Sequence, residues 1–459
     1  MKKTGFFLII SILLATSIAF TSCKGSADTD RGYNNTSEIA KPAWMEDMVL
    51  YELNVRQFTE EGTFAAIEDH VARLKDLGVD IIWFMPIHPI GEVNRKGPLG
   101  SYYSVADFKG ANPEFGTFED FKSLVDTIHK AGMRVLMDWV PNHSSWDNPL
   151  ATEHPDWYKK DDNGVFISPY DWTDVIQFDW SKQGLQDYML EALVFWVEEA
   201  GVDGYRVDHP HVTPADFWLR ARTEMEKIKP VLMLAENEDR VEFFENGFDM
   251  NYSWELHHLM NNVAQGKDRP RVLIDALERD FETFPPDAYR LRFITNHDEN
   301  SWAGTIEERM GDAGRAFAVF MYTIPGTPLI YNGQEAGLNK RLKFFERDPI
   351  DWGGYTLSGF YKVLNELKSD NPALHNGLAG GSFETISIAD NKSILAYKRE
   401  KDKNTVLTFL NMGEELVSFK VGNPLLHGKY NDLFTGDEVV LDENTVFDLG
   451  EWGYLVLTK

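Results

Sequence analysis

Carboxylates stand just after short apolar runs at several points of this chain, and this placement constrains the fold more than any other feature. Asp208, Glu236 and Asp298 follow runs that we predict to be buried strands, and Asp138 closes another such run. Charged side chains are rarely buried without partners, so these residues mark the points where strands leave the core. Parallel strands of one barrel bring their carboxyl ends to the same face. The pattern therefore predicts a barrel enzyme whose acids converge on one substrate bond.

Strand-like and helix-like segments alternate from about Trp44 onwards. The predicted strands cover residues 49–55, 79–85, 133–138, 202–208, 231–236, 248–251, 290–296 and 328–333. Segments with helical spacing of apolar residues separate them, and the clearest are residues 65–77, 118–130, 185–200 and 361–370. This alternation predicts an α/β fold, a (β/α)8 TIM barrel, over residues 44–376.

Two further regions interrupt and follow the predicted barrel. Residues 144–183 are rich in Trp, Asp, Pro and Asn without a clear period, so we predict a short loop domain inserted after the third strand. Residues 377–459 instead contain short β-branched runs separated by Gly, Asn and Asp, at 384–388, 393–398, 404–410, 416–421 and 453–457. Such spacing is typical of a small antiparallel β-sandwich.

The N-terminus has the composition of an export signal. Two lysines precede an apolar stretch, residues 6–20, which is too short and too poorly flanked for a stable membrane span. Small residues then lead to Cys23, the only cysteine, which cannot form an internal disulfide. The segment resembles a bacterial lipoprotein signal, which predicts a signal peptide over residues 1–22 and a lipid on Cys23. An ordinary secretory signal with a chance cysteine is the alternative.

Composition also narrows location and partners. Residues 23–43 are rich in small and polar residues, which indicates a flexible tether, and Lys24 after the cysteine suits outer-membrane sorting of an exported protein. The formal net charge is −28. Such an acidic chain argues against nucleic acid, whose phosphates require clusters of Lys and Arg, and disfavours attraction to anionic lipids. We therefore expect membrane contact only through the lipid anchor.

Short motifs occur in a fixed order along the predicted barrel. They are Asp138-Trp-Val-Pro-Asn-His143, Gly204-Tyr-Arg-Val-Asp208, Glu236 and Phe293-Ile-Thr-Asn-His-Asp298. Together they resemble the conserved regions of the α-amylase family, glycoside hydrolase family 13. A single Asn-His-Asp would be weak evidence, whereas the whole set in order on barrel-like strands is specific. The resemblance covers roughly residues 44–459.

The resemblance implies a role for each acid. Asp208 would be the nucleophile that forms a covalent glycosyl-enzyme, with Arg206 holding it ionised and oriented. Glu236 would be the general acid and base, with a pKa raised by burial after its apolar run. Asp298 would hold sugar hydroxyls and favour a distorted ring. Taken alone, Arg206 with Asp208 could equally be a plain buried ion pair.

Other residues are candidates for substrate binding. His143 and His297 would donate hydrogen bonds that strengthen in the transition state. Tyr103, four residues before an aspartate, matches the family's stacking tyrosine, and Asp138 serves either packing or catalysis. Aromatic rings stack on the apolar faces of sugars, so the remaining candidates are Trp139, Trp146, Trp172, Trp180, Trp302 and, at a turn, His88.

Two positions depart from the family pattern. Many members carry Lys-His three and four residues after the nucleophile, where this chain has His211 and Val212. We therefore predict that His211 binds substrate in an altered acceptor subsite. Gln177 stands where members with structural calcium commonly have an acidic ligand alongside Asn142, and an amide weakens a Ca²⁺ site. We expect no required cofactor and no tightly bound calcium at the usual position.

The predicted function is a retaining glycoside hydrolase that cleaves α-glucosidic bonds, mainly α-1,4, of starch-type glucans or maltooligosaccharides. The nearest alternative is a transglycosylase or isomerase that uses the same covalent intermediate, because acceptor choice depends on the altered subsite. A non-catalytic glycan-binding protein would lack at least one of Asp208, Glu236 and Asp298, and all of them are present.

Overall fold

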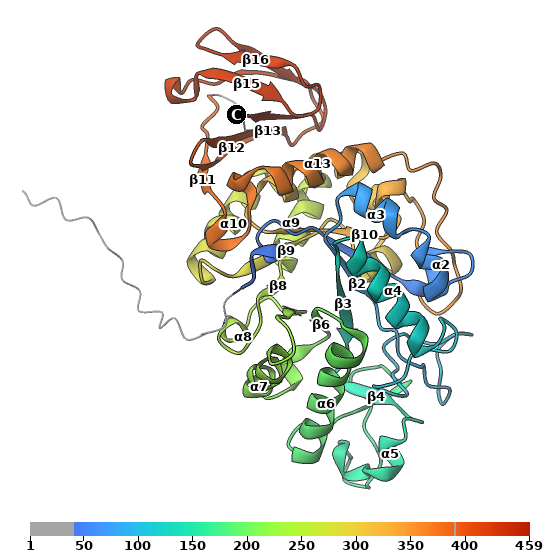
Figure 1. Cartoon of the computed structure of the whole chain (residues 1–459). Coiled ribbons are helices and arrows are strands. Elements are labelled where there is room, and N and C mark those ends of the chain that lie inside the picture. Colours follow the sequence, from blue (N-terminus) through green and yellow to red (C-terminus); the bar gives the residue numbers. More distant parts are fainter. Residues whose placement is uncertain (1–40, 390–391) are drawn as a thin grey trace, which may run out of the picture. The chain divides into compact units, whose positions relative to one another are not determined.

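The predicted barrel strands all form in the computed structural model, which describes residues 41–389 and 392–459. They are β1 (Leu50–Leu53), β2 (Ile81–Phe84), β3 (Arg134–Trp139), β6 (Gly204–Val207), β7 (Leu232–Ala235), β8 (Met250–Tyr252), β9 (Tyr289–Arg292) and β10 (Thr327–Tyr331). Neighbouring strands are parallel, and β1 pairs with both β2 and β10, which closes the barrel (Figure 1). The predicted (β/α)8 TIM barrel is confirmed.

Helices follow the strands in sequence and cover the barrel. The main ones are α3 (Val71–Leu77), α4 (Phe118–Lys130), α6 (Gln183–Phe195), α7 (Ala215–Glu226), α9 (Trp254–Ala264), α10 (Arg271–Thr283), α12 (Gly314–Thr323) and α13 (Ser358–Asp370). In α4 the local chemistry is plain: Thr117 and Asp120 form a capping box, and Phe121, Leu124 and Ile128 lie on its buried face. The predicted helix at 65–77 is instead divided into α2 (Phe64–Glu68) and α3.

One glycine sets how closely two barrel strands approach. Gly204, at the start of β6, has φ +138°, and a Cβ there would lie 1.9 Å from the carbonyl oxygen of Leu232 on β7. Only glycine fits such a backbone conformation and such a contact. The consequence reaches the active site, because β6 and β7 lead directly into Asp208 and Glu236.

The predicted loop region after the third barrel strand contains regular structure of its own. Its short strands β4 (His143–Ser145) and β5 (Val175–Gln177) pair antiparallel, with His143 opposite Gln177, and α5 (Leu150–Glu153) lies between them in sequence. The bounds of this region, like the other predicted domain bounds, stay predictions.

Antiparallel sheets follow the barrel, as predicted. One sheet has the order β11 (Ser382–Thr385), β12 (Ile394–Lys401), β13 (Asn404–Asn411), β18 (Tyr454–Thr458), β15 (Gly428–Asp432) and β16 (Glu438–Leu441). The other pairs β14 (Val417–Lys420) with β17 (Val446–Leu449). Phe409 of the first sheet lies 5.5 Å from Phe419 and 5.8 Å from Phe447 of the second, between ring centroids, so the sheets share one core.

The sandwich is joined to the barrel by buried contacts. The hydroxyl of Tyr397 on β12 lies 2.6 Å from that of Thr323 on α12, and the ring of Phe360 on α13 stacks on Phe434. Over residues 41–389 and 392–459, no helix has the length and apolarity needed to cross a bilayer. The predicted signal peptide, Cys23 and most of the tether lie outside the described residues.

Candidate active site

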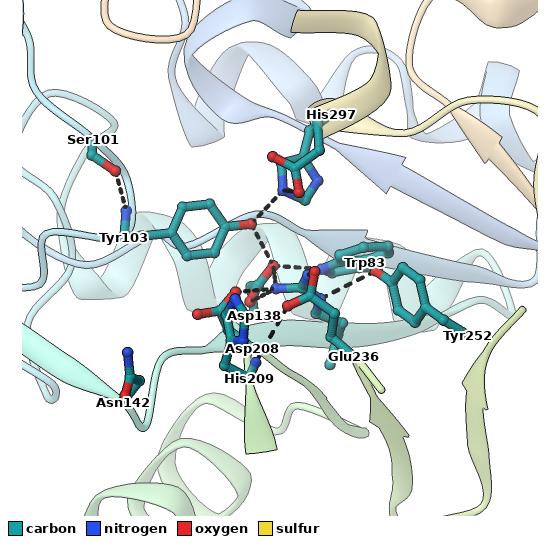
Figure 2. Close-up of polar contacts among 12 residues, drawn as sticks. Trp83, Ser101, Tyr103, Asp138, Asn142, Asp208, His209, Glu236, Tyr252 and His297 are labelled. Carbon is teal, nitrogen blue, oxygen red and sulfur yellow. Dashed lines mark hydrogen bonds and ion pairs between the residues drawn. The ribbon is translucent and has the colours of Figure 1, made fainter. Parts of the chain in front are cut away.

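The predicted acids lie at the carboxyl-terminal face of the barrel, and Figure 2 shows Asp138, Asp208 and Glu236 close together. Asp138 lies within β3, while Asp208 and Glu236 each lie one residue beyond their strands. Asp298 lies farther from β9, immediately before a π-helical turn, Glu299–Ala303. A cavity of about 460 Å³ opens there. Its walls include the predicted residues Tyr103, His143, Asp208, Glu236, His297 and Asp298.

Arg206 holds three carboxylates at the floor of this cavity. Its Nη1 donates to Asp138 Oδ1 at 2.9 Å and to Asp208 Oδ1 at 3.1 Å. Its Nη2 lies 2.8 Å from Glu236 Oε1, an ion pair without hydrogen-bond alignment. The guanidinium is fully buried, and its Nε donates to the hydroxyl of Tyr252 at 3.2 Å. One cation therefore positions both predicted catalytic groups.

Asp208 and Glu236 titrate as a coupled pair. Burial, together with the facing Glu236 charge, raises the pKa of Asp208 well above its usual range. Burial also acts to raise the pKa of Glu236, but the Arg206 guanidinium and neighbouring histidines outweigh it, and the pKa of Glu236 is lowered. The pKa directions predicted from sequence are therefore wrong for this arrangement. Arg206 acts to lower the pKa of both carboxyl groups, and its effect exceeds that of burial at Glu236 but not at Asp208.

The backbone of the residue after Asp208 is strained and donates a hydrogen bond to Glu236. His209, which follows Asp208, has φ +42°, in the left-handed region that side chains rarely adopt. This conformation directs its backbone N–H to Glu236 Oε2, at 3.3 Å. The ring of His209 lies 5.5 Å from that of Trp172, between centroids, on the cavity wall.

A hydrogen-bonded chain crosses the site from β1 to β3. Burial opposes protonation of His297, but the charges of Asp298 and Glu52 raise its pKa to about 9. The ring therefore donates from Nδ1 to Glu52 and from Nε2 to the Tyr103 hydroxyl at 2.9 Å. Tyr103 in turn donates to Asp138 Oδ2 at 3.1 Å (Figure 2). Despite Arg206, burial raises the pKa of Asp138 to about 6.

The acids differ in how far they face the cavity. The side chain of Asp298 is 40% exposed, against 10% for Asp208 and 12% for Glu236. The open carboxylate suits a group that accepts hydrogen bonds from a ligand, while the buried pair suits groups that react in a dry environment. His143 also lines the cavity, and burial lowers its pKa to about 3, so it is neutral.

Only part of the predicted aromatic set lines the cavity. Trp172 and Trp302 do, joined by Phe344 and Phe345, and the ring of Tyr103 stacks on Phe344 at 6.2 Å between centroids. The others are not among the lining residues: Trp139 and Trp180 are buried, Trp146 donates to a backbone carbonyl, and His88 is enclosed by aromatic rings. His88 has the structural role that its turn also allows, because its ring packs in the core behind the cleft.

His211 lies beside the cavity but not in its lining. Its ring is 5.3 Å from that of His209, between centroids, and burial and the neighbouring histidine lower its pKa. A role for His211 in binding substrate therefore stays a prediction.

The residues at the usual calcium position do not fit that ion. Gln177 Nε2 lies 3.5 Å from Asn142 Oδ1, so an amide N–H occupies the oxygen that a cation would need. The amide of Asn142 itself faces His143 Nδ1 at 3.1 Å. Within the described ranges, no group of three or more His, Cys, Asp or Glu side chains could hold a metal.

Several residues of the site carried no signal in the sequence. Glu52 on β1 and Tyr252 on β8 lie inside apolar strands, and Trp83 on β2 donates to Asp138 Oδ2 at 3.2 Å. Lys96, which lines the cavity, is paired with Asp174 at 3.2 Å. Among these residues, only Glu52 could have been noticed in the sequence, because it is a single charge within a strand whose other residues are apolar.

The raised pKa of His297 predicts pH-dependent stability. Its folded pKa of about 9 exceeds the ordinary 6.5, so the contribution is full below about pH 6.5 and is lost as the pH rises through about 9. We expect His297→Asn to be destabilised by up to about 3 kcal/mol more at pH 7 than at pH 10. Urea unfolding at both pH values measures this, with His258→Asn on the exposed face of α9 as control. A pH-independent difference for His297→Asn would contradict the assignment.

Known proteins share this sequence and fold. A family model described as alpha amylase, catalytic domain, matches residues 27–174 and 152–371. Alpha-amylase MalA of Haloarcula japonica is 30% identical over 438 residues, covering 89% of this chain, which spans 63% of that protein. The maltogenic alpha-amylase AmyB of Thermotoga neapolitana matches with TM-score 0.82 and 27% identity, over 90% of this chain and 99% of that chain. An alpha-amylase of Lactobacillus plantarum matches with TM-score 0.81 and 29% identity, over 91% and 99%. The chain belongs to the α-amylase family, glycoside hydrolase family 13.

Proposed function

We propose that this protein is a retaining glycoside hydrolase that cleaves α-glucosidic bonds, mainly α-1,4, of starch-type glucans or maltooligosaccharides. The observation that carries the proposal is the pair of buried carboxylates, Asp208 and Glu236, on neighbouring strands and joined by one guanidinium. Two carboxyl groups that share one proton are the chemical minimum for double displacement at a sugar. Membership of the family supports the same reaction.

The first step consumes the shared proton. With substrate bound, Glu236 carries this proton and gives it to the glycosidic oxygen as that bond breaks. The Asp208 carboxylate attacks the anomeric carbon and forms a glycosyl ester. Arg206 faces both groups, so it stabilises whichever carboxylate is charged. Water then attacks the ester, Glu236 takes its proton, and Asp208 is released.

The cavity walls supply substrate binding. Tyr103, Trp172, Trp302 and Phe344 present aromatic surface, Asp298 presents an acceptor, and the protonated His297 adds a positive charge. Sugar rings combine apolar faces with hydroxyl edges, so this mixture matches their chemistry. Because both acids are largely buried, binding of a sugar also excludes water from the reacting bond.

The roles of the pair can be separated by leaving group. We expect Glu236→Gln to lower kcat on maltoheptaose by about 10³-fold, because protonation of the leaving oxygen is lost. The loss should be much smaller on α-maltosyl fluoride, whose fluoride leaves with little acid assistance. Asp208→Asn should abolish turnover of both substrates, and Glu245→Gln, an exposed residue of α8 (Glu242–Glu245), is the control. Initial rates on the two substrates make the comparison.

The outcomes also decide between hydrolysis and transfer. Wild-type hydrolysis by Glu236→Gln would overturn the acid assignment, and equal losses on both substrates would remove its role in leaving-group protonation. Products of maltoheptaose with and without added glucose test the alternative enzyme class. Oligosaccharides that carry labelled added glucose at their reducing end would favour a transglycosylase.

We further propose that catalysis and folding need no calcium at the Asn142–Gln177 position. The support is the amide contact between these side chains, which leaves no anionic oxygen for the ion. We expect the melting temperature to be the same in EDTA as in added calcium chloride. Scanning calorimetry tests this, and a drop of many degrees in EDTA would refute it.

Finally, we propose that the protein is exported and anchored through a lipid on Cys23, most simply in the outer membrane of its host. The support is sequence alone: a positive start, an apolar stretch and a single cysteine before a polar tether. In a Gram-negative host, labelled palmitate should enter the wild type and not Cys23→Ala, which should appear in the soluble periplasmic fraction. Membrane retention of Cys23→Ala without label would refute the anchor.

A further inference from the structure

A second cavity lies at the opposite end of the barrel from the active site. It has a volume of about 370 Å³ and is lined by residues of β9, the segment before β10, the end of α10, and strands β11 and β12. Because the catalytic acids lie beyond the carboxyl ends of the strands, this cavity shares none of the residues of the site described above.

Buried arginines dominate its polar surface. Arg290, Arg292 and Arg399 are 5%, 1% and 1% exposed, and all line the cavity. Asp280 pairs with Arg290 at 3.3 Å and with Arg292 at 2.9 Å. Arg290 also pairs with Glu238 at 3.3 Å. Three guanidinium groups thus face two carboxylates, which leaves at least one positive charge without compensation.

Arg399 is the group without a counter-ion. It forms no ion pair with any residue of the described chain, and it donates only to the carbonyls of Ser382, at 3.1 Å, and Gly381, at 3.3 Å. Burial lowers its pKa to about 10, so it stays charged at neutral pH. A buried charge without a partner is costly, and the fold supplies none from its own side chains.

Two guanidinium nitrogens of the lining arginines have no hydrogen-bond partner. Nη1 of Arg292 and Nη1 of Arg399 are both buried and have no hydrogen-bond partner. The other nitrogens of these side chains already bind carbonyls or Asp280. Unmade hydrogen bonds of a charged donor are rare in a folded core, and each points to an acceptor that the chain itself lacks.

The remaining wall is apolar. Phe281, Phe284 and Phe383 line the cavity together with Pro285 and Pro286. Phe281 is 48% exposed, although its ring lies 5.7 Å from that of Phe383, between centroids. Phe281 is exposed enough to give contact area to the apolar part of a ligand in this charged cavity. The cavity therefore combines guanidinium groups with aromatic rings, and the Arg290 guanidinium itself lies 3.8 Å from the Phe284 ring centroid.

We infer that this cavity binds a small organic carboxylate. The carboxylate accepts hydrogen bonds from the open Nη1 groups of Arg292 and Arg399, and its apolar body lies against Phe281 and Phe383. A negative charge matches the cation that lacks compensation, and the two oxygens of a carboxylate provide one acceptor for each Nη1 group. The site is independent of glycoside hydrolysis, so its failure or success leaves the proposed function untouched.

Titration calorimetry on the full-length protein tests the inference with three related probes, which differ in whether they carry a ring and a negative charge. Phenylacetate should bind, acetate should bind at least about tenfold more weakly because it lacks the ring, and neutral 2-phenylethanol should not bind. Arg399→Gln should weaken phenylacetate about tenfold or more, and Arg279→Gln on the exposed face of α10 should leave it unchanged. Unaltered maltoheptaose hydrolysis shows that each variant is folded.

A second variant tests the site without removing a buried residue, in case loss of Arg399 disturbs the fold. Phe281→Ala removes an exposed ring, so it should weaken phenylacetate and leave acetate binding as it was. No phenylacetate binding at millimolar concentration, equal binding of 2-phenylethanol, or wild-type affinity in Arg399→Gln would overturn the proposal. Inorganic phosphate that binds more tightly than phenylacetate would overturn the assignment to a carboxylate.

Discussion

The chemistry of this protein depends on one buried guanidinium. Arg206 is fully enclosed and is the shared partner of Asp138, Asp208 and Glu236. Without it, three carboxylates would be buried beside each other, an arrangement that neither desolvation nor like-charge repulsion allows to stay ionised. The same cation acts to lower the pKa of each of these carboxyl groups, against the effect of burial. Arg206 therefore both stabilises the fold at this face of the barrel and supports its acid–base chemistry.

A chain of hydrogen bonds connects the carboxylates bound by Arg206 to other residues around the open end of the barrel. His297 carries a proton between Glu52 and the Tyr103 hydroxyl, and Tyr103 passes a hydrogen bond to Asp138. These residues come from β1, β3 and loops after β2 and β9. Each acceptor is therefore oriented by a donor that is itself held, and the cavity wall needs little rearrangement when a sugar binds.

The fold was predictable where burial leaves a simple trace. Parallel strands buried on both faces appear as continuous apolar runs, so every barrel strand was found. Strands β15, β16 and β17 were missed because their half-exposed residues mix polar and apolar side chains without a clear run. Motif order located the acids, but Glu52, Trp83 and Tyr252 belong to no motif and act only through three-dimensional proximity. The pKa directions failed for the same reason, since they depend on which carboxylate Arg206 Nη2 faces.

The contact at Gly204 has a consequence for how this site can change over time. Asp208 and Glu236, the proposed nucleophile and acid, follow two strands whose close approach at the other end depends on the missing side chain of Gly204. The reacting groups themselves can be surrounded by new loops and new aromatic walls without disturbing that close approach. Substrate preference and the spacing of the two acids therefore depend on different parts of the chain. Loops around the cavity can change in sequence, while Gly204 has to remain glycine.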